Sequence, residues 1–123
     1  MSPSAVVIAS QNSLITASLS EFLRRHFRSV HVAQTPQDLE SAIVRHRAEA
    51  AIADLETISL DDVARLHQSF GQVNIVCTHR VPDEQMWADS LAAGAADCCH
   101  HGDHAEIARA ALGRRYKIQS NAA

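Results

Sequence analysis

Ala50-Ala51-Ile52-Ala53-Asp54 is the stretch of sequence that decides the fold. Four apolar residues followed directly by a carboxylate are typical of a strand that is buried on both faces and carries a polar residue at its carboxyl end. The same pattern occurs at Ala5–Ala9, which is followed by Ser10 and Gln11, and at residues 73–78. These runs predict the central strands of a parallel sheet.

Amphipathic stretches alternate with the apolar runs, as expected for a parallel sheet that is covered by helices on both faces. We predict a helix after each strand, the first continuing to about Arg28 and the last ending near residues 114–117. Ser59 and Asp62 have the spacing of a capping box at the start of the third helix. The predicted strands comprise residues 5–9, 30–33, 49–54, 73–78 and 96–99.

Composition and charge indicate one globular domain over residues 1–123, with a core at about 5–117 and a frayed tail at 118–123. The net charge of −3 provides no basic surface for nucleic acid, and no apolar run approaches the roughly 18 residues that span a bilayer. Three cysteines, two of them adjacent, argue against a disulfide framework and agree with a reducing compartment. We therefore expect a cytoplasmic protein that binds neither nucleic acid directly nor membranes.

Polar residues follow four of the predicted strands, and the carboxyl ends of parallel strands lie at one edge of a sheet. These residues include Asp54, Thr78 and the run Cys98-Cys99-His100-His101. They are expected to line one crevice, together with the two polar residues that follow the first strand. The crevice is therefore the predicted location of any ligand chemistry.

These strand ends, with the turn Ala93-Gly94-Ala95-Ala96-Asp97, resemble the receiver domain of two-component response regulators over about residues 5–117. By this resemblance, Asp54 is at the phosphoacceptor position and Thr78 at the position of the switch hydroxyl. The resemblance also implies the fold class: α/β, a doubly wound five-stranded parallel sheet in the order 2-1-3-4-5, flavodoxin-like, in a three-layer sandwich.

Several positions depart from the family pattern. Ser10 and Gln11 stand where an acidic pair belongs, Cys98 stands at the usual switch aromatic, and His101 stands at the lysine. Mg²⁺ prefers carboxylate oxygens, so we expect its binding to be weak or absent and predict no cofactor. Phosphoryl transfer needs a metal ion and a fixed cation, and losing one such contact commonly costs about 100- to 1000-fold in rate. Glu56 could compensate only if its side chain turned back toward the crevice.

The expected function is a non-enzymatic, receiver-like signalling module, a pseudo-receiver, that acts by protein–protein contact without phosphorylation. No nucleophile–base pair or Gly-rich phosphate loop indicates an enzyme. The expected partners include a second copy of the chain, bound through the face of the fourth helix, fifth strand and fifth helix. Candidate interface residues on this face are Met86, Trp87, Ile107 and Tyr116.

Two other functions stay open at this stage. The first is a working phosphoacceptor, Asp54, in a two-component phosphorelay that controls an output such as transcription. The second is a ligand- or metal-sensing domain built from the crevice residues Ser10, Gln11, Asp54 and His101. Metal-dependent labelling by a small phosphodonor distinguishes the first, and a thermal-shift screen distinguishes the second.

Simpler structural roles also stay open for some of these residues. Asp54 can be a solvated carboxylate that caps backbone N–H groups. Cys77 and one of Cys98 or Cys99 can be small core residues. Adjacent strand residues point to opposite faces, so Cys98 and Cys99 cannot easily bind one ion together. His101 and His104 are the best-spaced pair for a metal, but this spacing is a weak signal.

Overall fold

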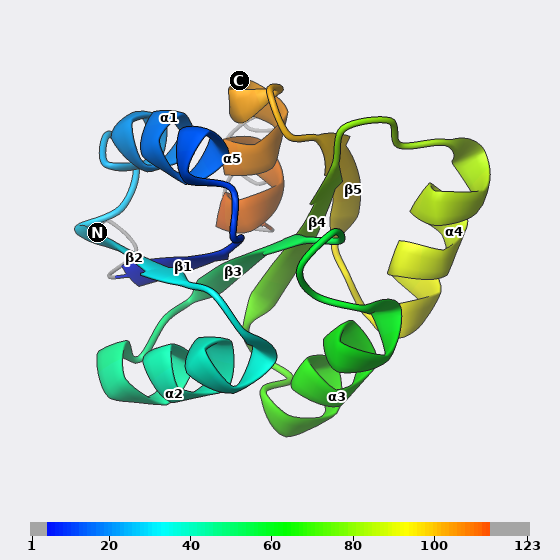
Figure 1. Cartoon of the computed structure of the whole chain (residues 1–123). Helices are drawn as coiled ribbons and strands as arrows, with labels where there is room; N and C mark the ends of the chain where they lie inside the picture. The colour runs from blue at the N-terminus through cyan, green and yellow to red at the C-terminus, as the bar shows by residue number, and fades with distance from the viewer. Residues whose placement is uncertain (1–4, 114–123) are drawn as a thin grey trace, which may run out of the picture.

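The computed structural model describes residues 5–113 of the chain. Five parallel strands form one sheet in the order β2-β1-β3-β4-β5 (Figure 1). The strands are β1 Ala5–Ala9, β2 Ser29–Ala33, β3 Ala50–Asp54, β4 Asn74–His79 and β5 Asp97–His100. The helices are α1 Ser13–Leu23, α2 Pro36–His46, α3 Leu60–Ser69, α4 Glu84–Ala93 and α5 His104–Leu112. The predicted strand order and fold class are confirmed.

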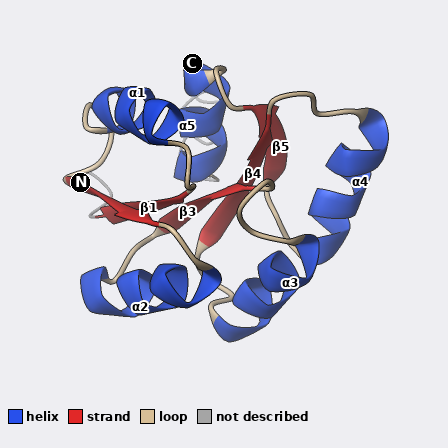
Figure 2. Ribbon diagram, viewed as in Figure 1, coloured by secondary structure: helices blue, strands red, loops and turns tan. Residues whose placement is uncertain are grey.

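The helices cover both faces of the sheet (Figure 2). Alternate residues of each central strand point to opposite faces, so Val7 and Ala51 contribute to one apolar core while Val6 and Ile52 contribute to the other. The first core is closed by α2, α3 and part of α4, and the second by α1 and α5. This arrangement is the predicted three-layer sandwich.

Short polar side chains begin the helices, as expected where the first backbone N–H groups lack helical partners. The predicted capping box is confirmed: the Ser59 hydroxyl accepts the Asp62 N–H, and the Asp62 carboxylate accepts the Ser59 N–H. Thr35 caps α2, ahead of Pro36 at its first turn. In the described part of the chain, no helix is long and apolar enough to cross a membrane.

Some predicted boundaries were wrong. The first helix ends at Leu23 instead of near Arg28, because the chain tightens into turns that lead to β2. Phe27 is nevertheless buried in the core that also contains Leu23, and its N–H donates to the Leu23 carbonyl. The last helix ends at Leu112, and Gly113 follows with a positive φ of 66°. The strand predicted at 96–99 is formed by Asp97–His100.

Two histidines that are far apart in the sequence stack on each other. The rings of His31, in β2, and His46, at the end of α2, lie 3.4 Å apart between centroids and 5° from parallel. They line a polar hollow of about 640 Å³, which Asp38 and Arg45 also line. Burial lowers the pKa of His31, and the nearby His46 lowers it further.

This stack predicts a loss of stability in mild acid. Because the folded-state pKa of His31 is below its unfolded value of about 6.5, folding favours the neutral ring. The His31 contribution is therefore fully present above that pH, and it declines as the pH falls through and below it. We expect the urea midpoint to drop between about pH 7.5 and pH 5.5, and to drop less in His31→Gln. An equal drop in both proteins would contradict this assignment.

Candidate functional site

The predicted crevice residues come together at the carboxyl edge of the sheet. Asp54 is the last residue of β3 and is in register with Thr78 of β4, and Ser10 directly follows the neighbouring strand β1. All three side chains are buried. The apolar runs that predicted the strands therefore also bring these polar side chains to one place.

Each oxygen of the Asp54 carboxylate accepts a hydrogen bond from within the protein, and we call this carboxylate closed. The Ser10 hydroxyl donates to Asp54 Oδ2 at 2.6 Å, and the Glu56 N–H donates to Asp54 Oδ1 at 3.0 Å. The Ser10 hydroxyl also accepts the Asn12 N–H at 3.1 Å. Asp54 is only 5% exposed, so the interpretation of a solvated carboxylate is wrong, although its bond to a backbone N–H is present as that interpretation expected.

Gln11 is directed away from Asp54. Its side-chain amide donates to the Gln34 carbonyl at 3.1 Å, and its backbone N–H donates to the Thr57 hydroxyl, also at 3.1 Å. Gln11 thereby joins the loop after β1 to the loops after β2 and β3. Its position in the sequence places it at the crevice, but its hydrogen bonds make it a link between loops.

Neither the His101 ring nor the Glu56 carboxylate reaches Asp54. His101 donates its backbone N–H to the His79 carbonyl, and its ring lies 4.5 Å from that of His100. Within residues 5–113, no hydrogen bond or ion pair joins His101 to Asp54. The Glu56 carboxylate lies 3.5 Å from Arg80 on the surface, so it does not turn back into the crevice. Such exposed ion pairs add little stability.

The donor groups in the crevice do not fit a magnesium ion. Mg²⁺ requires near-octahedral oxygen ligands and is usually held by carboxylates. The crevice contributes one carboxylate, Asp54, and both of its oxygens already accept hydrogen bonds. The described residues also contain no group of three His, Cys, Asp or Glu side chains that could hold a metal ion.

The two adjacent cysteines lie on opposite faces of the sheet. Cys98 belongs to the core closed by α2 and α3, and Cys99 belongs to the core closed by α1 and α5. Both are buried, so the expectation that only one of them is a core residue was wrong. The reason is that β5, although an edge strand, is covered by α4 on one face and by α5 on the other.

The four candidate interface residues have different environments. Trp87 is 48% exposed, and its indole N–H donates to Asp97 Oδ1 at 3.1 Å, which joins α4 to β5. Met86 is partly buried and packs against the core. Ile107 is 0% exposed, so its assignment to the interface was wrong. Tyr116 lies outside the described residues. Val81, in the loop between β4 and α4, is 69% exposed, and the sequence analysis missed it.

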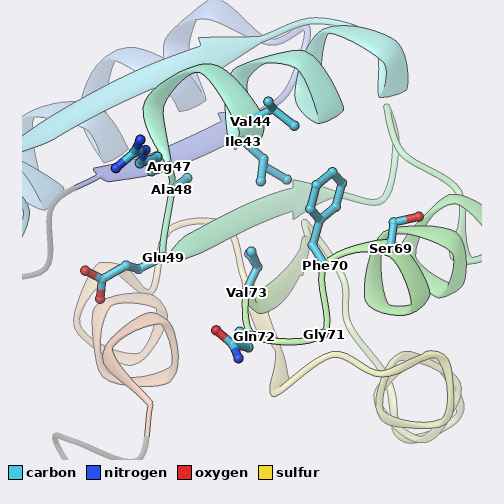
Figure 3. Close-up of a pocket in the computed structure, with 10 residues that line it drawn as sticks. All are labelled: Ile43, Val44, Arg47, Ala48, Glu49, Ser69, Phe70, Gly71, Gln72 and Val73. Carbon is cyan, nitrogen blue, oxygen red and sulfur yellow. The ribbon is translucent and has the colours of Figure 1, made fainter.

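A separate hollow of about 520 Å³ lies near the amino ends of β3 and β4, at the opposite edge of the sheet from Asp54. Figure 3 shows Ile43 and Val44 of α2 directed toward Phe70, with Val73 beside them. Sequence reasoning missed this hollow, because its walls come from segments that pair only in the folded chain. Val44 is 65% exposed on an otherwise polar helix surface, and this apolar residue is the one signal of the hollow that the sequence contains.

Comparisons with known proteins give a consistent result for the fold. No family model matches the chain, and no curated protein matches it. A two-component response regulator of the LuxR family from Aurantimonas sp. SI85-9A1 is 12% identical, with a TM-score of 0.78 over 96% of this chain and 87% of that one.

Two further structures give the same result. A response regulator from Thermotoga maritima is 19% identical, with a TM-score of 0.78 over 98% of this chain and 99% of that one. The N-terminal signal receiver domain of a response regulator from Bacteroides fragilis is 16% identical, with a TM-score of 0.79 over 90% and 95%. The chain therefore has the fold of response-regulator receiver domains.

Proposed function

We propose that this chain is a non-enzymatic, receiver-like signalling module that acts by protein–protein contact and does not depend on phosphorylation. The observation that carries the proposal is the closed carboxylate of Asp54, which is held by the Ser10 hydroxyl and the Glu56 N–H. A phosphoacceptor must attack with an oxygen, and the charge that develops must be met by a metal ion and a fixed cation. Each Asp54 oxygen already accepts one hydrogen bond, and the His101 ring contacts that of His100.

We also propose that the protein does not bind Mg²⁺ in solution. With neutral Ser10 and Gln11 in place of an acidic pair, the crevice has a single carboxylate to offer. The ligand- or metal-sensing alternative loses one of its four side chains, because the Gln11 amide donates to the Gln34 carbonyl.

Titration with Mg²⁺ and then with beryllofluoride, a phosphoryl mimic, tests the proposal. We expect backbone amide shifts and Trp87 fluorescence to stay unchanged at millimolar Mg²⁺. Saturable shifts around Asp54 and Thr78 that disappear in Asp54→Ala would overturn the proposal and restore a phosphorylation switch.

A restored variant provides the matched control. The double change Ser10→Asp with Gln11→Asp puts one carboxylate beside Asp54 and a second at the next residue, so we expect lower stability without metal and a Mg²⁺-dependent rise in Tm. A rise in this variant only would show that the assay detects binding and that the native crevice lacks it.

The proposed partner surface is the face of α4, β5 and α5. Trp87 contributes to it a half-exposed aromatic ring, the residue type most enriched at interface hot spots. A second copy of the chain is the partner we propose first. Sedimentation analysis of the protein over a range of concentrations measures whether such a dimer forms.

A further inference from the structure

Two of the three cysteines face each other on the same side of the sheet. Cys77 of β4 and Cys98 of β5 are partners in register, and both belong to the same core. Neighbouring strands lie about 4.8 Å apart, which is within the roughly 4.4–6.8 Å between Cα atoms that a disulfide can bridge. Both thiols are free.

Ser90 of α4 lies over this pair. It is 0% exposed, and its hydroxyl makes no hydrogen bond of regular geometry with any described residue. Burial raises the pKa of Cys77 to about 12 and also raises that of Cys98, while the Ser90 hydroxyl acts on both thiols in the opposite direction.

We infer that Cys77 and Cys98 are a modification site, a thiol pair that hydroperoxides convert to a reversible disulfide between β4 and β5. Cys98 reacts first, because it is on the edge strand and is 8% exposed against 0% for Cys77, and it reacts slowly, because burial raises its pKa. Its sulfur attacks the peroxide, the O–O bond breaks, and the products are a sulfenic acid and water. The Cys77 sulfur then displaces the sulfenic oxygen, which leaves as a second water, so two thiols and one hydrogen peroxide yield one disulfide and two waters.

Cys99 provides an internal control. It is also buried, and burial raises its pKa to about 12, but its side chain is on the opposite face of the sheet. In the native fold only Cys98 can reach Cys77. In the unfolded chain the two cysteines are adjacent in sequence and should pair with Cys77 about equally, because loop closure depends only weakly on loop length.

The reduced full chain is oxidised with hydrogen peroxide, its remaining thiols are alkylated, and it is digested with trypsin. Cleavage after Arg80 separates Cys77 in residues 66–80 from the other two cysteines in 81–109, and fragmentation between Cys98 and Cys99 identifies the linked sulfur. We expect two thiols to be lost, at least about a tenfold excess of the Cys77–Cys98 link, and recovery of both thiols with dithiothreitol. In urea the excess should disappear.

Three single cysteine variants are compared, so that the test still works if one of them fails to fold. Cys99→Ala should keep the link, whereas Cys98→Ala and Cys77→Ala should each abolish it. Three free thiols in the oxidised folded protein would overturn the inference. So would a native-state link to Cys99, or equal pairing with and without urea.

Discussion

Ile107→Ala is expected to lower the free energy of unfolding by about 2–5 kcal/mol, the range for truncating a buried isoleucine. Ile107 is 0% exposed and packs from α5 into the core that α1 also closes. Removing three carbons there leaves a cavity between the helix and the sheet. Urea unfolding followed by circular dichroism measures the change.

Leu14→Ala is the matched control for this prediction. Leu14 is also a large apolar residue on a helix, but it is 82% exposed. Its truncation should change the unfolding free energy by no more than about 0.5 kcal/mol. Equal effects at the two positions would show that Ile107 is not a core residue.

Gly94→Ala is expected to destabilise the protein through two separate effects. Gly94 ends α4 with a φ of 111°, where a side chain adds about 1–2 kcal/mol of backbone strain. A Cβ atom built there would lie 2.3 Å from Cγ and 2.7 Å from Cβ of His67, so the α3–α4 contact must also shift, at a further cost of about 1–3 kcal/mol. The midpoint of urea unfolding measures the sum.

Two controls separate these effects. In Gly71→Ala the nearest atom to the new methyl is the His67 carbonyl oxygen at 3.7 Å, an ordinary contact, so little change is expected. Adding His67→Ala to Gly94→Ala should recover the part of the steric cost that comes from the imidazole ring, and leave the backbone part and the overlap with Cβ at position 67. If the two changes are simply additive, His67 is not the source of the clash.

The central strands could be predicted because each is marked by its own residues, whereas their order followed from the resemblance to receiver domains. The run Ala50–Asp54 and the run Ala5–Ala9 are apolar without interruption, and only a sheet covered on both faces buries such strands completely. The carboxyl ends of these strands followed from the topology, so Asp54, Ser10 and Thr78 were correctly brought to one edge.

The side-chain contacts in the crevice could not be predicted in the same way. The bond between Ser10 and Asp54 joins residues 44 positions apart, and it depends on the direction of each side chain as its strand ends. Gln11 was expected in the crevice, but it bonds to Gln34 across a loop whose path depends on the packed fold. Helical spacing likewise left Met86 and Trp87 undecided until the position of α4 against β5 set the buried side.

The two cores of the sandwich differ in when the growing chain can complete them. The core beneath α2 and α3 receives most of its residues by Leu66. The opposite core also needs Ile107, Ala108 and Ala111, which are synthesised after every strand of the sheet. Until α5 emerges from the ribosome, α1 alone covers the sheet face that carries Ile52 and Val76. At that stage the nascent chain has one completed core and one incomplete core, and we expect chaperones to bind the exposed apolar surface of the incomplete one.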